Sequence, residues 1–79
     1  MGTVEKLQLA AKRRVVAIIT YTDSKGNATA REVEPYELRD DCFFAYCIAN
    51  AGIRNFKINR IMTVTVTNKP YIPKWPINM

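Results

Sequence analysis

The chain has 79 residues, of which 48% are hydrophobic and 10% aromatic, and its 12 Lys and Arg against 7 Asp and Glu give a formal charge of +5. This length predicts one small domain, residues 1–79, and the composition excludes a disordered chain. No apolar run approaches the roughly 18 residues that would suggest a membrane span, and the N-terminus lacks the apolar block of a secretory signal. We therefore expect a cytoplasmic protein without membrane contact. The charge makes a phosphate-bearing partner the first to consider, with lysines that merely maintain solubility as the alternative.

The first expected element is a short helix over residues 3–13. Thr3 can cap this helix and Glu5 lies in its first turn, which favours a negative charge. Val4, Leu7, Leu9 and Ala11 supply its apolar side. The next segment, RVVAIITYTD, is rich in β-branched residues and predicts a strand.

A hairpin is expected next, because the loop DSKGN separates that strand from a second one, ATAREVEPYEL. Pro35 has no N–H to donate, so we expect it at the end or edge of the second strand. The segment RDDCFFAYCIAN is the third extended candidate, and the turn Asn50-Ala51-Gly52 follows it.

Residues 53–61, IRNFKINRI, carry a cation at every third position, which fits one side of a helix. Two asparagines, β-branched neighbours and a short length favour a strand instead. In a strand, Arg54, Phe56, Ile58 and Arg60 share one face. The following MTVTVTN alternates Met62, Val64 and Val66 with three threonines, which predicts a strand with one buried face.

The last segment holds three of the four prolines and predicts an extended tail over residues 68–79, with Tyr71 and Trp75 pinning it to the body. The fold class is therefore mainly β, with one short N-terminal helix and about five strands over residues 15–67. Small SH3-like or OB-like barrels meet this description.

Catalysis and metal binding have little support in the sequence. It contains no His and no CxxC motif, and the acidic pairs Glu32/Glu34 and Asp40/Asp41 are typical of solvated carboxylates. Cys42 and Cys47 would point to opposite faces of a strand, so we expect two free thiols. We expect a binding module, with no enzymatic activity and no cofactor.

Recognition of nucleic acid needs cations for phosphate and flat rings for bases. The candidate cations are Arg31, Arg54, Lys57 and Arg60, and the candidate rings are Tyr21, Tyr46 and Phe43. Each ring taken singly is more often part of a core. Arg31 and Arg60 share a predicted face with apolar residues, so each needs an anionic partner. That partner is either a ligand or one of Glu32, Glu34 and Asp40.

Four spacings together point to a known family. They are Tyr21 at the end of the first strand, Arg-x-Val-x-Pro at 31–35, Ala-Tyr-Cys at 45–47, and Arg-x-Phe-x-hydrophobic-x-Arg-Ile at 54–61. From about Val15 to Thr67 the chain resembles the WYL domain of bacteria. The naming Trp-Tyr-Leu is replaced here by Asp-Cys-Phe at 41–43, and Lys57 stands where Arg is common.

The resemblance implies an SH3-like or Sm-like fold and a sensor or accessory module of a transcription regulator or DNA helicase. It implies that Arg31, Arg54 and Arg60, supported by Lys57, contact the phosphates of single-stranded DNA or another nucleic acid. Tyr21 and Tyr46 would line the wall of the site. The chain has no helix-turn-helix and no motor, so we expect either a part of such a protein or a small stand-alone protein.

Two alternatives remain at this stage. The same arginines would equally clamp a nucleotide or other small anionic effector. The proline-rich tail would instead serve protein interaction or oligomerisation.

Overall fold

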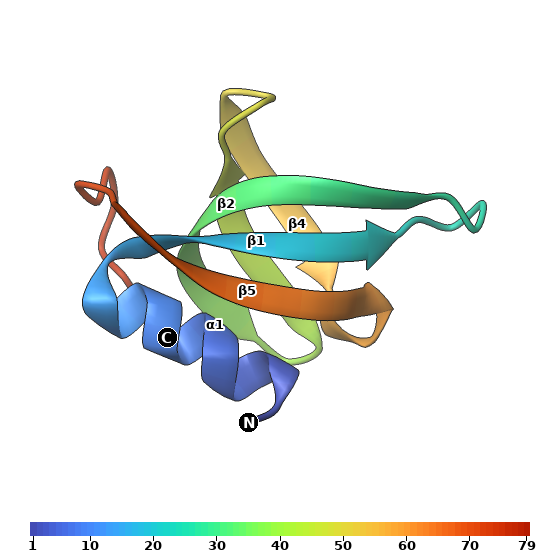
Figure 1. Ribbon diagram of the computed structural model, residues 1–79, viewed down its shortest axis with the longest axis horizontal. Coiled ribbons are helices and arrows are strands. Elements are labelled where there is room, and N and C mark those ends of the chain that lie inside the picture. Colours follow the sequence, from blue (N-terminus) through green and yellow to red (C-terminus); the bar gives the residue numbers. More distant parts are fainter.

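The structure is a computed structural model that describes residues 1–79. It contains one helix, five strands and one 3-10 turn (Figure 1). The elements are α1 (Thr3–Arg13), β1 (Val15–Thr22), β2 (Ala28–Arg39), β3 (Cys42–Cys47), β4 (Gly52–Lys57), η1 (Ile58–Arg60) and β5 (Ile61–Pro70). No helix is long and apolar enough to cross a bilayer.

All five strands belong to one antiparallel sheet with the order β4-β3-β2-β1-β5. The mainly β fold with a single N-terminal helix is therefore confirmed. The two edge strands, β4 and β5, form no ladder with each other, so the sheet is open and the expected SH3-like barrel is not confirmed. Figure 1 shows α1 alongside β5 and β1, with β4 crossing behind β1.

The helix covers the expected residues, but its cap differs from the prediction. Gly2, and not Thr3, is the N-cap residue, and its N–H donates to the Glu5 carboxylate at 3.0 Å. Arg14 ends the helix in the left-handed conformation, with a φ of 53°. Glu5 thus satisfies a free N–H of the helix start, which is the role that a negative charge has at this end.

The main core lies between α1 and the inner face of the sheet. Cross-strand partners point to the same side of a sheet, so the ladders define this face. Every strand and the helix contribute to a core of Leu7, Ala10, Ala17, Ile19, Val33, Phe43, Ala45, Phe56, Ile61 and Val64. Phe43 is fully buried there, which removes it from the candidate binding rings.

Pro35 lies within β2, contrary to the expectation of a strand end. The last residue of β2 that pairs with β1 is Val33, so no β1 ladder requires the Pro35 N–H. Tyr36 is an extra residue between the β2–β3 pairs of Pro35 and Glu37, which makes a bulge. The proline is accommodated because the β1–β2 ladder has already ended.

The segment 53–61 is a strand only through Lys57. Ile58–Arg60 form the turn η1, so Ile58 and Arg60 do not continue the face of Arg54 and Phe56, and the predicted four-residue face is wrong. The reason is topological. β4 and β5 follow each other in the chain but lie at opposite edges, so the chain must leave the sheet between them.

The predicted alternation in β5 holds only in part. Val64 is buried, but Met62 is 56% exposed. Thr20 pairs with Thr63 and Tyr21 with Ile61, so Met62 is the extra residue of a bulge and Ile61 takes the buried position. The strand also continues to Pro70, beyond the Thr67 that the sequence suggested.

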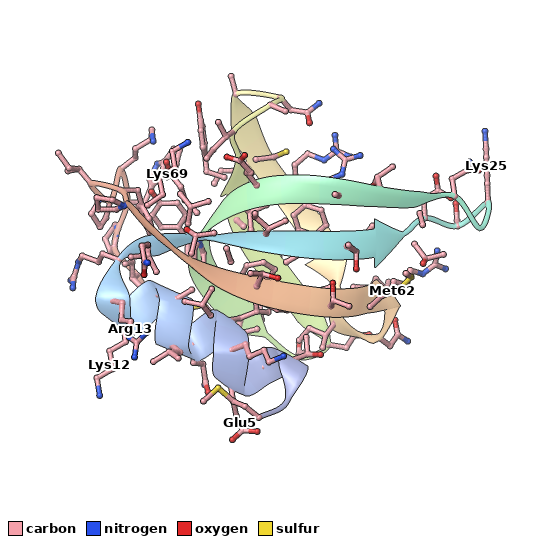
Figure 2. The ribbon with its side chains drawn as sticks, in the orientation of Figure 1. Glu5, Lys12, Arg13, Lys25, Met62 and Lys69 are labelled. Carbon is pink, nitrogen blue, oxygen red and sulfur yellow. The ribbon has the colours of Figure 1, made fainter.

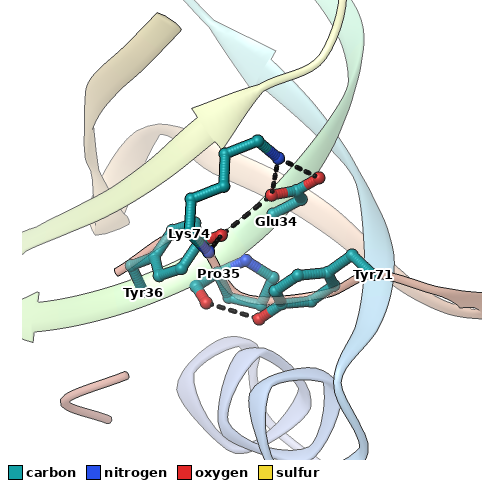
Figure 3. A network of polar contacts seen from close by, with 5 residues as sticks. All are labelled: Glu34, Pro35, Tyr36, Tyr71 and Lys74. Carbon is teal, nitrogen blue, oxygen red and sulfur yellow. Dashed lines mark hydrogen bonds and ion pairs between the residues drawn. The ribbon is translucent and has the colours of Figure 1, made fainter. Parts of the chain in front are cut away.

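Residues 71–79 form no helix or strand and return as a strap along β2, where Asn78 forms a bridge with Glu37. Figure 3 shows the polar contacts that hold the start of this strap. The Tyr71 hydroxyl donates to the Pro35 carbonyl at 2.7 Å. The Lys74 ammonium contacts both oxygens of the buried Glu34 carboxylate, at 2.9 and 3.1 Å. The Tyr36 hydroxyl donates to Glu34 at 2.9 Å and accepts the Lys74 main-chain N–H at 3.0 Å. This network fixes the strap.

Candidate functional site

The basic groove is a hollow of about 420 Å³ between the β1–β2 hairpin and the β4–η1 segment. Its lining consists of Tyr21, Asp23, Ser24, Thr29, Arg31, Arg54, Asn55, Phe56, Lys57 and Arg60. Four of these side chains are cationic and one is a carboxylate. The groove is therefore suited to an anion with several negative oxygens.

Arg31 reaches the groove from β2, where it pairs with the buried Ile19 of β1 and so shares the inner face. One guanidinium nitrogen donates to the Asn50 side-chain oxygen at 3.0 Å, while Nε is buried without a partner. The same Asn50 oxygen accepts the Cys47 thiol at 3.1 Å. Asn50 therefore holds the Arg31 guanidinium and leaves its charge unneutralised.

Arg54 and Lys57 come from β4, and Arg60 comes from η1. Arg54 pairs with the buried Ala45, so it extends the inner face beyond the core. Lys57 lies 3.7 Å from the Asp41 carboxylate, and both side chains are mostly exposed. An exposed pair of this kind holds Lys57 only weakly.

No arginine of the groove forms a salt bridge. The salt bridges of the molecule are Arg39–Glu37, Lys57–Asp41, Lys69–Glu32 and Lys74–Glu34. Glu32 and Glu34, the carboxylates expected as alternative partners of Arg31, are paired instead with Lys69 and Lys74. Asp40 pairs with no cation. The alternative in which these acids satisfy Arg31 or Arg60 is therefore wrong.

Asp23 brings a negative charge to the hairpin end of the groove. Its Oδ1 accepts the main-chain N–H groups of Lys25 and Asn27 at 2.8 and 2.9 Å, which closes the loop. These bonds, above all that from Asn27, lower the pKa of the Asp23 carboxyl, and the nearby Arg60 charge contributes slightly. Asp23 therefore stays ionised at neutral pH. Its negative charge ends the positively charged lining of the groove at the hairpin.

Tyr21 lines the groove. Its ring meets the edge of Phe56 with centroids 5.1 Å apart, and its hydroxyl accepts the Lys57 main-chain N–H at 3.2 Å. Both the ring and the hydroxyl are therefore engaged by β4.

Tyr46 lies outside the groove, on the outer face of the sheet, although the sequence grouped it with Tyr21. The Lys74 ammonium lies 4.3 Å from its ring centroid, and Trp75 lies 6.1 Å away. The alternation of β3 explains this placement, because Ala45 and Cys47 point inward and Tyr46 points outward.

Some basic side chains do not line the groove. Figure 2 shows Lys12 and Arg13 at the C-terminal end of α1 and Lys25 at the tip of the β1–β2 hairpin. Lys12 and Arg13 occupy the last turn of the helix, where cations are favoured by the helix dipole. The helix dipole therefore explains the position of Lys12 and Arg13 without a ligand.

Asp23, Thr29, Asn50 and Asn55 were not identified from the sequence as residues of this site. Asp23 and Asn50 stood in recognised turns, DSKGN and Asn50-Ala51-Gly52, but their side chains were assigned no role. Thr29 and Asn55 carry no charge and belong to no motif. Thr29 lies two residues before Arg31 and Asn55 follows Arg54 directly, but no feature of the sequence shows that they line the groove.

Comparison with known proteins agrees with this fold. The family model of the WYL domain matches residues 2–66. The chain is 32% identical over 74 residues to the uncharacterized HTH-type transcriptional regulator YobV of Bacillus subtilis (strain 168), covering 89% of this chain and 24% of that protein. It superposes on proteasome accessory factor B/C (PafBC) of Arthrobacter aurescens with a TM-score of 0.77 at 22% identity, covering 95% of this chain and 13% of PafBC. The chain thus spans about a quarter of YobV and less of PafBC. The chain belongs to the WYL domain family.

Proposed function

We propose that this WYL domain binds single-stranded nucleic acid, with single-stranded DNA favoured, in the basic groove, and that it acts as a non-enzymatic module of a regulator. The name of YobV, a transcriptional regulator, supports a setting in transcription. Arg31, Arg54 and Arg60 would contact phosphate, with Lys57 in support and Tyr21 at the wall. Tyr46 has no part in this proposal because it lies on the other face.

The observation that carries the proposal is the set of three arginines without a carboxylate partner around one hollow. Arg31 is the most telling, since its guanidinium is held by the neutral side chain of Asn50 and forms no salt bridge. A partly buried guanidinium whose charge has no counter-charge within the chain favours an anionic ligand. Phosphate oxygens match the planar fork of arginine.

The confined size of the groove favours a single strand over a duplex. A hollow of about 420 Å³ admits one stretch of phosphodiester backbone, whereas the rigid double helix holds its two backbones apart. Proteins that bind single strands use positive grooves of this kind, which follow one backbone.

A compact anionic effector, such as a nucleotide, is the second candidate, and the convergence of four cations on one hollow favours it as well. The two ligands differ in the number of phosphates engaged. A strand releases several counterions and gives a steep salt dependence, whereas a compact ligand gives a shallow one.

The interaction module proposed for the tail has weaker support. Tyr71 and Trp75 both contact Tyr36 of the same chain, and Tyr71 is buried. Ile72 is 88% exposed and Trp75 is 46% exposed, so these two side chains are the apolar contact points that the tail offers. Deletion of residues 70–79 removes the contacts with Tyr36 and should therefore impair folding. If the shortened domain instead folds, binds DNA and no longer self-associates, the tail serves assembly.

Binding of a fluorescent single strand and of a duplex of equal length tests the proposal. Arg60→Ala should weaken binding to the single strand while the circular dichroism spectrum stays unchanged. Lys12→Ala removes the same charge far from the groove and should leave binding nearly intact. Failure of the wild-type domain to bind either nucleic acid at low salt would exclude the proposal and turn attention to nucleotides.

A further inference from the structure

The groove borders an open edge of the sheet. β4 is an edge strand, so one side of its main chain pairs with β3 and the other side has no strand neighbour. In an antiparallel ladder, alternate residues direct their N–H and C=O groups to opposite sides. Every second N–H of β4 therefore faces away from β3.

Two hydrogen bonds determine which residues these are. The Lys57 N–H donates to the Tyr21 hydroxyl, on the side away from β3, at 3.2 Å. The next N–H, that of Ile58, donates back to the Asp41 carbonyl at the start of β3, at 2.9 Å. Counting back along β4, the N–H groups of Asn55 and Ile53 face the open edge, as that of Lys57 does.

Asn55 and Ile53 differ in what lies beside them. Asn55 lines the basic groove between Arg54 and Lys57, whereas Ile53 does not line it. The β3–β4 ladder leaves the Asn55 N–H on its outer side, where no strand lies to accept it. It is a fixed donor next to the cations and needs no side-chain ordering to reach an anion.

We propose that the main-chain N–H of Asn55 is a phosphate-binding donor of the groove, which acts together with the Arg54 and Lys57 side chains. The inference rests on the proposed function, since it takes the ligand to be a phosphodiester backbone. A main-chain donor reads the phosphate and not the base, so it fixes the position of the strand on the protein. The open edge of the sheet thus has a binding role that a closed barrel would remove.

Nuclear magnetic resonance of the ¹⁵N-labelled wild-type domain tests this directly. On addition of an oligothymidylate of about 12 nucleotides, the Asn55 amide proton should move downfield and exchange more slowly with solvent. The Ile53 amide, which faces the same edge outside the groove, should change little. An Asn55 amide that stays unchanged while the arginine side-chain signals shift would overturn the inference.

A set of variants gives an independent test. Asn55→Pro removes the outward N–H without removing a ladder bond, since proline is tolerated on the free side of an edge strand. Asn55→Ala removes the side chain but keeps the N–H, and Ile53→Pro removes an outward N–H away from the groove. Loss of a hydrogen bond to a charged group predicts affinity for the oligothymidylate about tenfold weaker in Asn55→Pro than in Asn55→Ala. Ile53→Pro should bind like the wild type.

The outcomes separate the two proposals. Equal affinities of Asn55→Pro and Asn55→Ala, both folded by circular dichroism, would contradict the role of the main chain and leave the groove intact as a site. Absence of binding by the wild-type domain would instead contradict the proposed function. Should Asn55→Pro fail to fold, the amide measurement on the wild-type protein decides.

Discussion

The hydroxyl of Tyr21 accepts the main-chain N–H of Lys57 at 3.2 Å, and this contact joins the end of β1 to the edge strand β4. β1 and β4 are not neighbours in the sheet. The basic groove lies where the side chain of one strand thus reaches the free edge of the other.

Tyr21→Phe tests the contribution of this contact. The ring packing on Phe56 is kept, and the freed Lys57 N–H is exposed to water, so we expect the free energy of unfolding to fall by only about 0.5–1 kcal/mol. Urea denaturation measures this change. A loss of several kcal/mol would show that the hydroxyl is a principal support of the fold and not a local tie.

Asn50→Asp tests whether the free charge of Arg31 matters. The substitution places a carboxylate where the amide oxygen now lies, 3.0 Å from the Arg31 guanidinium, and so supplies the missing counter-charge. We expect binding of an oligothymidylate to weaken about tenfold, because the phosphate must compete with this ion pair. Fluorescence anisotropy measures it.

Asn50→Ala is the matched control, since it removes the same contact without adding charge. It should weaken binding less than Asn50→Asp does. Equal binding by Asn50→Asp and the wild type would show that Arg31 contacts no phosphate.

Tyr46→Ala tests the separation of the two faces. Tyr46 contacts Lys74 and Trp75 on the outer face, so its removal should leave nucleic-acid affinity unchanged. The lost cation–π and ring contacts should lower the free energy of unfolding by about 1–2 kcal/mol. Thermal denaturation and anisotropy on the same variant measure the two effects. A large loss of affinity in a folded variant would show that the ligand binds the outer face of the sheet and not the groove.

Stability should fall at high pH because of the strap. Burial raises the pKa of Tyr71 above its usual 10.0, and the hydrogen bond to Glu34 raises the pKa of Lys74 above its usual 10.5. Each group holds its proton more tightly in the folded state. Its contribution is therefore fully present below those usual values and is lost as the pH rises through the raised ones.

The free energy of unfolding should thus be nearly constant from about pH 7 to 9 and decline above about pH 10. Urea denaturation across this range measures it. Tyr71→Phe removes one of the titrating groups and should make the decline shallower. A decline of unchanged slope in that variant would mean that Tyr71 does not contribute to it.

The sequence predicted the parts of the fold that depend on local patterns. The helix over residues 3–13 follows from its apolar spacing and charges, and the β1–β2 hairpin follows from β-branched runs around a Gly-containing loop. The predictions from sequence were wrong where the local structure depends on how distant strands pair. The turn at Ile58–Arg60 follows from strand order, and the bulges at Tyr36 and Met62 are irregularities of strand pairing; no local pattern encodes either.

The candidate site shows the same division. Five of the six predicted residues line one groove: Tyr21, Arg31, Arg54, Lys57 and Arg60. Family spacing and charge were the signals that identified them. Tyr46 was misplaced because the phase of β3 relative to its neighbours was not known. Asn50 contacts Arg31 from the turn after β3, and Asn55 lines the groove from β4, but no charge or motif in the sequence identified either residue.

The salt dependence of binding to an oligothymidylate tests the central claim most directly. Four phosphate contacts predict a slope of log K against log salt of about −2.8, and Arg31→Ala should reduce its magnitude by about 0.7. Lys12→Ala should leave the slope unchanged. A slope that is the same in the wild type and in Arg31→Ala would contradict the account, because the arginine without a counter-charge would then not contact phosphate.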